Sequence, residues 1–439
     1  MTTPTSHGKL KTFFETFPSV EFVRWTFVDY GNVSRCILTT VNQALKLAQK
    51  PGDTSAITVA PDIITAFWNT GQVDETVFYN RNDQLVPDWD TLKPTTNPEQ
   101  AMMMCSIKQT SKTEDEWWER DPRIVLKRIE DKARKEFGLE FQVGVEIEFR
   151  LIDSPTTLDL TPVPQAGYGL SLIRDPMFAV CTEAVKQMEK AGVHVWAFAG
   201  DEPGVFEIAL GPSSPLKAVD NVVYAYDAIK SMAIKHGVHA TMHPKLFENG
   251  TGTGQHIHMS LDKEEMADSF LAGLLAHLPG ISPFLLAGVD SYSDTRSFYS
   301  GGDDVFWSQT KIVPIRRIGT SRFEFRQPDG LGNTYLQVAS LLGVGLDGIR
   351  KQLKLEIKEC KHEKPGPLDD ETRKALGITE KLPTTLGAAI VAMENDEVVL
   401  KEALGELCYE RYLLHRKEEI TKTMGTTREE RVKAIVMNI

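Results

Sequence analysis

Acidic residues that alternate with apolar ones are the feature of this sequence most suited to chemistry. Glu146 and Glu148 alternate with Ile147 and Phe149, and Glu207 lies in a similar apolar stretch. Because successive side chains of a β-strand point to opposite faces, an extended segment would display Glu146 and Glu148 together on one face. A sheet with one hydrated face gives the same alternation, so each segment alone is also typical of a surface strand.

Two further segments alternate in the same way and add imidazole, hydroxyl and guanidinium groups. Cross-strand pairs of arginine and glutamate commonly stabilise sheets, so each of these segments taken singly also fits a structural role. We therefore base the functional interpretation on all four segments together. The polar positions of the two added segments are His256, His258 and Ser260, and Arg322, Glu324 and Arg326.

If the four segments are strands of one sheet, four carboxylates meet near imidazoles and arginines. Carboxylates packed together repel one another unless cations lie between them. Oxygen ligands with a single nitrogen suit Mg²⁺ or Mn²⁺ better than zinc, and no cysteine lies near these segments. Arginines facing such ions indicate an anionic ligand, and we expect a phosphate.

The glycine-rich run Asn249–Gly254 lies directly before the histidine segment. No Gly-Lys-Ser/Thr follows it, and it leads into a predicted strand and not into a helix, so it is neither a P-loop nor a dinucleotide-binding loop. Two interpretations stay open. The run is either a flexible hairpin connection or a loop whose backbone closely approaches a ligand.

The first part of the chain, residues 19–107, is rich in strands and turns. Alternating residues from Phe22 end at Tyr30-Gly-Asn32, and a second alternating run begins at Cys36. This pattern predicts a β-hairpin. A polar stretch, 108–120, is interpreted as a connector to the second part.

The second part, residues 121–439, alternates strand patterns with helical ones. Asp121 before Pro122 is a helix-capping pair, and apolar residues recur at helical spacing until Gly138 ends the run. The fold class that we predict is therefore α+β, with a larger mixed domain after the small one. Further helices are predicted at 178–191, 215–236, near 334–357 and over about 385–437.

Composition excludes several classes of protein. The 439 residues include 49 Lys and Arg against 61 Asp and Glu, for a net charge of −12, which argues against general binding to nucleic acid or anionic membranes. Five scattered cysteines without a CxxC pair indicate reduced thiols and a cytoplasmic protein. We expect no secretory signal. The apolar window from Phe270 to Val289 contains two prolines, and we interpret it as two buried pieces joined by a turn.

The order of these segments resembles the glutamine synthetase family. The similarity runs from Phe27-Val-Asp-Tyr-Gly in the first part to the C-terminal helices, and four segments in the family's order carry it. The resemblance implies a small β-grasp-like domain at 19–107 and a catalytic domain with a curved antiparallel sheet at 121–439. It also implies a ring-shaped homo-oligomer with active sites between subunits. The implied reaction uses ATP to activate a carboxylate as an acyl phosphate, which an amine then converts to an amide.

The resemblance also implies roles for individual residues. One Mg²⁺ or Mn²⁺ would be held by Glu148 and Glu207, and a second by Glu146, His256 and Glu324. ATP, the substrate carboxylate and the transferring phosphoryl group would meet further residues of the same motifs. These are Arg322, His258 and Ser260 for ATP, Arg326, Gly252 and Thr251 for the substrate, and Arg316 with Lys311 for catalysis.

Departures from the family pattern concern both a metal ligand and the substrate sites. The family's third carboxylate on the first metal falls at Ala199-Gly200, with Asp201 and Glu202 displaced toward Glu207. Whether either of them completes that site is left open. The sequence offers Lys311 where the family usually has an arginine, which keeps the charge without the bidentate fork.

The substrate subsites depart further. Thr251 replaces an asparagine that holds glutamate, and Asp294 replaces an arginine, with Arg296 two positions later. Residues 67–69, Phe-Trp-Asn, lack the aspartate that binds ammonium in authentic glutamine synthetases. We therefore expect an amine other than ammonia, with Trp68 able to contact a larger amine, and we leave the acid open.

Two alternatives come from other classes of protein. With a metal carboxylate displaced, the chain is alternatively an inactive scaffold or regulator. A phosphagen-type kinase has related sheet architecture but needs no such set of metal ligands. The role of Asp303 and Asp304, in a glycine-containing loop, is also open between a solvated loop and a shield for the intermediate.

Overall fold

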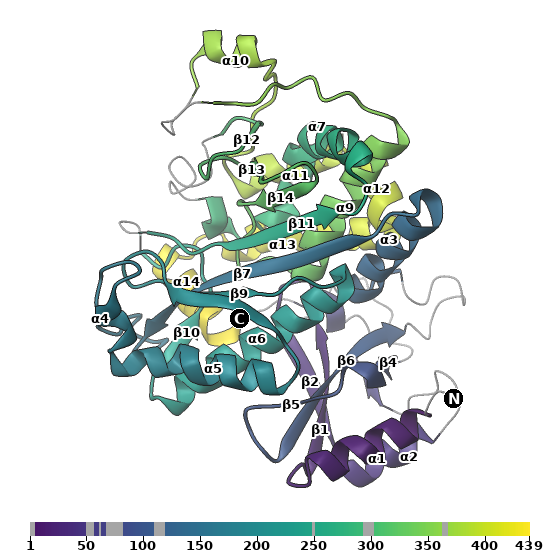
Figure 1. The fold of residues 1–439 in the computed structure, drawn as a ribbon, viewed down its shortest axis with the longest axis vertical. Helices are drawn as coiled ribbons and strands as arrows, with labels where there is room; N and C mark the ends of the chain where they lie inside the picture. Colours follow the sequence, from purple (N-terminus) through teal and green to yellow (C-terminus); the bar gives the residue numbers. More distant parts are fainter. Residues whose placement is uncertain are drawn as a thin grey trace.

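Two β-sheets and a set of helices make up the structure, a computed structural model (Figure 1). The first sheet is formed by the N-terminal part of the chain and the second by the following part. The division into domains at 19–107 and 121–439 stays a prediction. The structure describes residues 5–49, 57–60, 63–66, 82–108, 119–247, 251–292, 303–361 and 368–439.

The first sheet contains the predicted hairpin. Its two strands are antiparallel, and Asn32 makes the left-handed turn between them at φ 64°, a conformation that asparagine adopts more readily than most residues. The strand order is β2-β1-β6-β4-β3, with β5 also paired to β6 and with β1 parallel to β6. The elements are α1 Ser6–Thr16, β1 Phe22–Val28, β2 Ser34–Thr40, α2 Val41–Ala48, β3 Thr58–Val59, β4 Asp83–Pro87, β5 Lys93–Pro94 and β6 Gln100–Lys108.

Helix α3, Pro122–Phe137, connects the two sheets and begins and ends where the sequence predicts. The Asp121 carboxylate accepts a hydrogen bond from the Ile124 amide, and Gly138 ends the helix at φ 58°. The other oxygen of Asp121 accepts from the Ile107 amide, at the end of β6. One aspartate therefore joins the start of this helix to the first sheet.

The second sheet carries the four alternating segments on adjacent strands. Its order is β12-β13-β14-β11-β7-β9-β8, with β10 also paired to β7. All pairs are antiparallel except β12 with β13. The strands are β7 Phe141–Ile152, β8 Val195–Gly200, β9 Phe206–Leu210, β10 His239–Thr241, β11 Gln255–Leu261, β12 Trp307–Ser308, β13 Ile315–Arg317 and β14 Arg322–Phe325.

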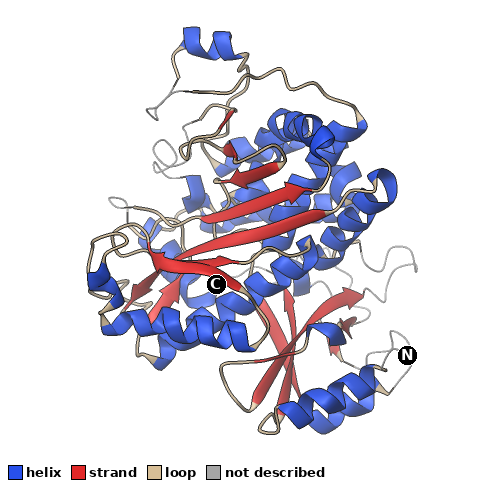
Figure 2. Cartoon of the chain, in the orientation of Figure 1, coloured by secondary structure: helices blue, strands red, loops and turns tan. Residues whose placement is uncertain are grey.

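Helices gather around the second sheet (Figure 2). α6 packs against β7 and β9, and α7, α9, α11 and α12 pack against one another. The predicted α+β class is confirmed. The helices of this part are α4 Leu170–Ile173, α5 Ala179–Lys190, α6 Pro215–Lys235, α7 Ala267–Leu285, α9 Thr334–Arg350, α10 Asp370–Leu376, α11 Leu386–Asn395, α12 Glu397–Leu404, α13 Glu406–Thr423 and α14 Arg428–Asn438.

Two helix predictions need correction. The apolar window from Phe270 is a continuous helix and not two pieces, because α7 runs through both Pro279 and Pro283. An internal proline costs about 3 kcal/mol, and the burial of most of this helix against α9 and α11 offsets that cost. The predicted helix near 334–357 ends at Arg350. Among the described residues, no helix is both long and apolar enough to cross a membrane.

Strand β7 has one face in the core and one face toward the functional residues. Ile147 and Phe149 have no exposed surface, and the Phe149 ring stacks on that of Phe206 with centroids 5.5 Å apart. Glu146 and Glu148, at the alternate positions, point to the opposite face. The alternation that the sequence displays is therefore the alternation of a strand with a packed side and a polar side.

Candidate active site

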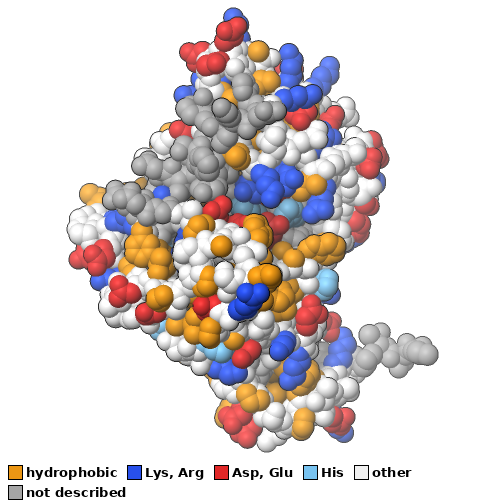
Figure 3. Space-filling model, turned by 60° about the vertical axis from the view of Figure 1, so that its left-hand side comes forward, with side chains coloured by type: hydrophobic (Ala, Val, Ile, Leu, Met, Phe, Trp, Pro, Cys, Tyr) orange, Lys and Arg blue, Asp and Glu red, His pale blue; other side chains and the backbone are white. Residues whose placement is uncertain are grey.

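A cavity of about 490 Å³ opens over the polar face of the second sheet. Figure 3 shows acidic, histidine and basic side chains gathered in a hollow on this face of the molecule. The charged residues that line it come from β7, β9, β11, β13, β14 and the connecting loops. They are Glu146, Glu148, Asp201, Glu202, Glu207, His256, His258, Lys311, Arg316, Glu324, Arg326 and Asp329.

One group of carboxylates joins Glu148, Asp201 and Glu207. Glu148 on β7 is the register partner of Glu207 on β9, which places the two side chains together on one face. Asp201 directly follows β8, and one oxygen from each of the three carboxylates lies within 4.8 Å of the others. The sequence left open whether Asp201 or Glu202 completes this group. The structure brings in Asp201.

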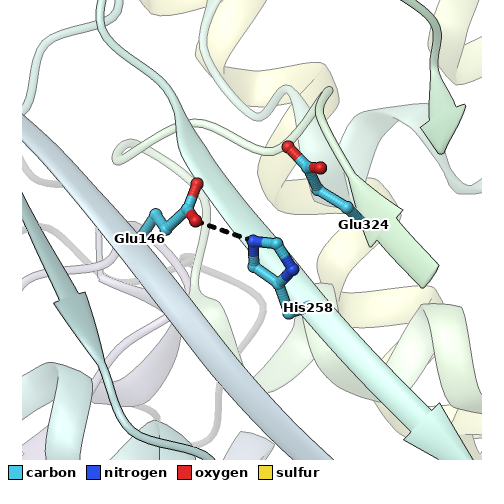
Figure 4. Close-up of side chains that lie close together, drawn as sticks. All are labelled: Glu146, His258 and Glu324. Carbon is cyan, nitrogen blue, oxygen red and sulfur yellow. Dashed lines mark hydrogen bonds and ion pairs between the residues drawn. The ribbon is translucent and has the colours of Figure 1, made fainter. Parts of the chain in front are cut away.

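A second group joins Glu146, His258 and Glu324 (Figure 4). Nε2 of His258 lies 2.9 Å from a Glu146 oxygen, and His258 is the register partner of Glu324 across β11 and β14. His256 lies between the two groups. Its Nδ1 is 3.3 Å from Glu146, 3.8 Å from Glu148 and 3.9 Å from Glu324. Both imidazoles therefore lie within reach of the carboxylates.

Cationic side chains border the second group. Arg316 Nη1 donates to Glu324 at 2.8 Å, and Arg326 Nη1 donates to the other oxygen of the same carboxylate. Lys311 lines the cavity as well. Carboxylates and basic groups therefore share one cavity, as the sequence predicts.

The carboxylates in this cavity repel one another, and this repulsion affects the pKa of Glu207. Burial, and then the neighbouring Glu146, Glu148 and Asp201 carboxylates, raise the pKa of Glu207 to about 8. Burial acts in the same direction on Glu146, but hydrogen bonds with His256 and His258 outweigh it and hold the pKa of Glu146 well below its ordinary value.

The donor atoms fit divalent cations that prefer oxygen ligands. The group of Glu148, Asp201 and Glu207 offers oxygen atoms alone, and the other group adds an imidazole nitrogen. Mg²⁺ and Mn²⁺ favour such sets, and zinc favours more nitrogen and sulfur. Burial first, and then the neighbouring carboxylates, raise the pKa of Glu207, so its charged form is unfavourable there, and a bound cation would stabilise it.

Other predicted site residues take different positions. Thr251 and Gly252 line the cavity. Ser260 and Arg322 are register partners farther along β11 and β14, outside its lining, although Arg322 Nη2 lies 3.5 Å from Nδ1 of His258.

The acidic pair of the glycine-containing loop does not line the cavity. The Asp304 side chain is buried in an ion pair with Arg373 at 3.0 Å, and the Asp303 carbonyl accepts from the Leu382 amide. Several predicted features lie outside the described residues: Phe67, Trp68, Asn69, Asn249, Gly250, Asp294 and Arg296.

Two residues of the site were missed by the sequence analysis. Arg150, on the polar face of β7, donates from Nη1 to the Pro203 carbonyl at 3.0 Å and from Nη2 to the Thr251 carbonyl at 2.9 Å and to its hydroxyl. Tyr168 lines the cavity and donates its hydroxyl to Asp201. The position of Arg150, two residues after Glu148, is the signal that could have identified it.

Comparisons with known proteins define the family. Residues 119–434 match the model of the glutamine synthetase catalytic domain. Glutamine synthetase of Methanocaldococcus jannaschii is 30% identical over 91% of this chain and 92% of its own length. Protein fluG of Emericella nidulans is 32% identical over 97% of this chain, which spans about half (50%) of that protein.

Solved structures agree in fold. A GmaS chain in complex with ADP superposes with a TM-score of 0.78 over 96% of this chain and 98% of that one, at 24% identity. A structure described as a novel glutamine synthase homolog superposes with a TM-score of 0.77 at 19% identity. The chain belongs to the glutamine synthetase family, a family of enzymes that form carbon–nitrogen bonds. The resemblance predicted from the sequence is confirmed.

Proposed function

We propose that this chain is an ATP-dependent ligase that activates a carboxylate as an acyl phosphate and joins it to an amine other than ammonia. The observation that carries the proposal is that two clusters of possible metal ligands lie in one cavity with Lys311, Arg316 and Arg326. The clusters come from neighbouring strands and are Glu148, Asp201 and Glu207, and Glu146, His258 and Glu324. Such a site serves phosphoryl transfer, because cations and arginines stabilise the charge of the transferring group.

The proposed metal ligands follow the two groups. Glu148, Asp201 and Glu207 would hold one Mg²⁺ or Mn²⁺. Glu146, Glu324 and an imidazole would hold the other, with His256 as the ligand that the family motif implies and His258 within the same reach. Bound ions would supply charge neutralisation and would orient the phosphates of ATP.

The basic side chains of the site would contact both the substrate carboxylate and the phosphoryl group that is transferred to it. Arg326 would hold the carboxylate that is activated, and Arg316, with Lys311, would stabilise the transferring phosphoryl group. Their shared partner Glu324 fixes the guanidinium groups of both arginines before substrate arrives, which lowers the cost of organising the site. Arg322, His258 and Ser260 would contact ATP, from the adjacent stretch of β11 and β14.

The substrate subsites support a changed specificity. Thr251 lies at the position of a substrate-holding asparagine. Its carbonyl and hydroxyl oxygens accept hydrogen bonds from Arg150, so these atoms stabilise the loop and are not directed at a substrate. Gly252 beside it would line the acid site. The altered residues 67–69, with Trp68, favour a larger amine, whereas the replacement of an arginine at Asp294 alters the site that holds the acid. The acid is left open.

The inactive-scaffold alternative depended on a missing metal carboxylate. Asp201 supplies a carboxylate beside Glu148 and Glu207, so we favour the ligase. Calorimetric titration with a nonhydrolysable ATP analogue and Mn²⁺ separates the two, because a scaffold need bind neither.

Substrates are tested by phosphate release with ATP, Mg²⁺ or Mn²⁺ and a panel of acids and amines. We expect turnover with an alkylamine or larger amine to exceed turnover with ammonia, and we expect Glu324→Gln to abolish it. Fastest turnover with glutamate and ammonia would contradict the altered specificity. Absence of turnover, together with absence of nucleotide binding, would contradict the ligase.

We also propose a cytoplasmic homo-oligomeric ring with active sites between subunits. Light scattering after size-exclusion chromatography should give a mass that is a multiple of 49.1 kDa. A monomer with full activity would contradict this part.

A further inference from the structure

The carboxylate of Asp201 comes from a loop, whereas the two carboxylates grouped with it come from strands. Asp201 directly follows β8, and its amide donates to the Val205 carbonyl at 3.1 Å, so the pairing of the β8–β9 hairpin continues one residue beyond the strand. Gly204, at φ 70°, completes the turn. Loops are more mobile than the strands that they connect. The direction of the Asp201 side chain therefore depends on what holds this hairpin end, residues 201–205.

A tight turn, residues 166–169, packs against the hairpin end. The amide of its last residue donates to the carbonyl of its first at 3.0 Å, and the Tyr168 amide donates to the Gly200 carbonyl at 2.7 Å. A Cβ atom added to Gly167 would lie only 2.1 Å from the backbone oxygen of Asp201. The turn can therefore approach the hairpin end this closely only with glycine at that position.

Tyr168 has a backbone conformation that costs free energy. Its φ of 54° lies in the left-handed region, which costs a residue with a side chain about 1–2 kcal/mol. The residue is 69% exposed, so burial of its ring does little to offset that cost. Tyr168 lines the cavity, and its hydroxyl donates to Asp201. An unfavourable backbone conformation beside an active site indicates a functional constraint, and the contact with Asp201 identifies one.

Arg150 holds the other side of the hairpin end. Its Nη1 donates to the Pro203 carbonyl at 3.0 Å, and a Cβ atom added to Gly204 would lie 3.0 Å from the same nitrogen. Because Arg150 contacts the backbone here, it fixes where the hairpin end lies but not where the Asp201 carboxylate points. Tyr168 contacts the carboxylate itself, so the two residues have different roles.

We propose that Tyr168 is a positioning residue for one of the two metals. Its hydroxyl holds the Asp201 carboxylate toward Glu148 and Glu207, so that this displaced residue can act as the third ligand. This role rests on the proposed function, which assigns a metal to these carboxylates. A carboxylate has two oxygens with about four lone pairs, so Asp201 can accept from Tyr168 and still bind an ion.

Binding of Mn²⁺ to the intact, assembled protein tests this role without any reaction. Electron paramagnetic resonance detects free aqueous Mn²⁺, so a titration without nucleotide or substrates gives the number of bound ions and their dissociation constants. We expect two ions per wild-type chain. Tyr168→Phe should weaken one of them about 10- to 100-fold and leave the other unchanged, because the hydroxyl contacts a ligand of only one group. Wild-type affinities in the variant would overturn the proposal, as would an equal loss at both ions.

Leu170→Ala is the control for the segment that carries the tyrosine. Leu170 is 63% exposed and lies outside the lining of the cavity, so its truncation alters the segment and keeps the hydroxyl. We expect wild-type Mn²⁺ affinities and an unchanged melting temperature. A loss of affinity as large as that of Tyr168→Phe would show that the packing of the segment matters and not the hydroxyl, and would overturn the proposal.

A double-mutant cycle shows whether the tyrosine acts through Asp201. Asp201→Ala should weaken the same ion, and the addition of Tyr168→Phe should weaken it no further, because the hydroxyl has lost the carboxylate that it orients. Glu148 and Glu207 remain in both variants, so binding is measured at higher Mn²⁺ concentrations. A full further loss from Tyr168→Phe in the Asp201→Ala background would overturn the proposal.

The same titration separates this role from the proposed function. Absence of Mn²⁺ binding by the wild-type chain would contradict the metal ligands proposed for the reaction, and this role with them. Two bound ions that Tyr168→Phe leaves unaffected would contradict this role alone. Neither result depends on turnover, so the identity of the acid and the amine does not enter the test.

Discussion

Glu207 is the residue through which pH should act on the site. In the metal-free protein its pKa is about 8, so below that pH the carboxyl holds a proton that a divalent cation must displace. Binding of Mn²⁺ should therefore release about one proton, and affinity should rise by up to about tenfold per pH unit until pH 8 and then level off. Calorimetry in two buffers of different ionisation enthalpy measures the protons released.

The variant Glu207→Gln serves as the control for that measurement. It removes the titrating carboxyl, so weaker binding without the pH dependence is expected. A wild-type affinity that stays constant between pH 6.5 and 8 would contradict the assignment.

Arg150 should act through the loops that it joins and not through the reaction itself. It is 6% exposed and connects the Pro203 loop to the Thr251 loop, which bring Asp201 and Gly252 to the cavity. Arg150→Lys keeps the charge but cannot reach both loops, so we expect kcat/KM to fall about 10- to 100-fold, with much of the loss in KM for the acid. Arg174→Lys, on the exposed surface, is the control. An unchanged KM would contradict this role.

At the scale of elements, Asp121 should be worth more than an ordinary helix cap. Asp121→Ala removes the acceptor of the Ile124 amide and of the Ile107 amide in one change, at a residue that is 3% exposed. We expect a loss of about 2–4 kcal/mol in stability, as a cap and a buried unsatisfied amide together imply. Thermal unfolding followed by circular dichroism measures the effect.

Thr385→Ala gives the matched comparison for Asp121. Thr385 caps α11 through the Ala388 amide and is exposed, so its loss should cost only about 1 kcal/mol. Equal effects of the two substitutions would show that the contact with β6 contributes nothing.

Secondary-structure elements and candidate ligands could be predicted where a pattern of neighbouring residues in the sequence determines them. The alternation around Glu146 and Glu148 marks one polar strand face, and Asp121 with Gly138 marks both ends of α3. Asp201 could not be placed, because its position depends on how β8 pairs with β9, where Ala199 is the register partner of Glu207 and Gly200 that of Phe206. Packing between distant segments decides such details.

The same limit explains the other two differences. The partners of Arg150 are 53 and 101 residues away along the chain, so no local pattern connects them. Helix α7 continues through Pro279 and Pro283 because neighbouring helices bury it, an effect that outweighs the local preference of proline.

For the whole molecule, Arg123 should hold the two parts of the chain together. It lies on α3 and pairs with Asp88, beside the first sheet, and with Asp220 on α6. Within the described part of the chain, Arg123→Met would leave the buried Asp220 carboxylate with only the Tyr335 hydroxyl as a hydrogen-bond partner, and we expect a loss of about 3–5 kcal/mol in stability. Differential scanning calorimetry should show the melting temperature fall.

Lys417→Met is the control for Arg123. Lys417 pairs with Glu394 at 2.6 Å, but both side chains are exposed, so this change should cost less than about 1 kcal/mol. A similar effect of the two substitutions would mean that the buried connection does not stabilise the junction.

Most of the residues proposed to handle phosphate lie on hydrogen-bonded strands, whereas those proposed to face the acid and the amine lie largely in connecting loops. Insertions and replacements in loops disturb a sheet little. Related proteins can therefore change the acid and amine that they accept through loop substitutions, and still keep the strands that hold the residues proposed to bind metal and phosphate. Efforts to redirect this protein to new products should begin at Thr251 and the Pro203 turn, and leave β7 and β11 untouched.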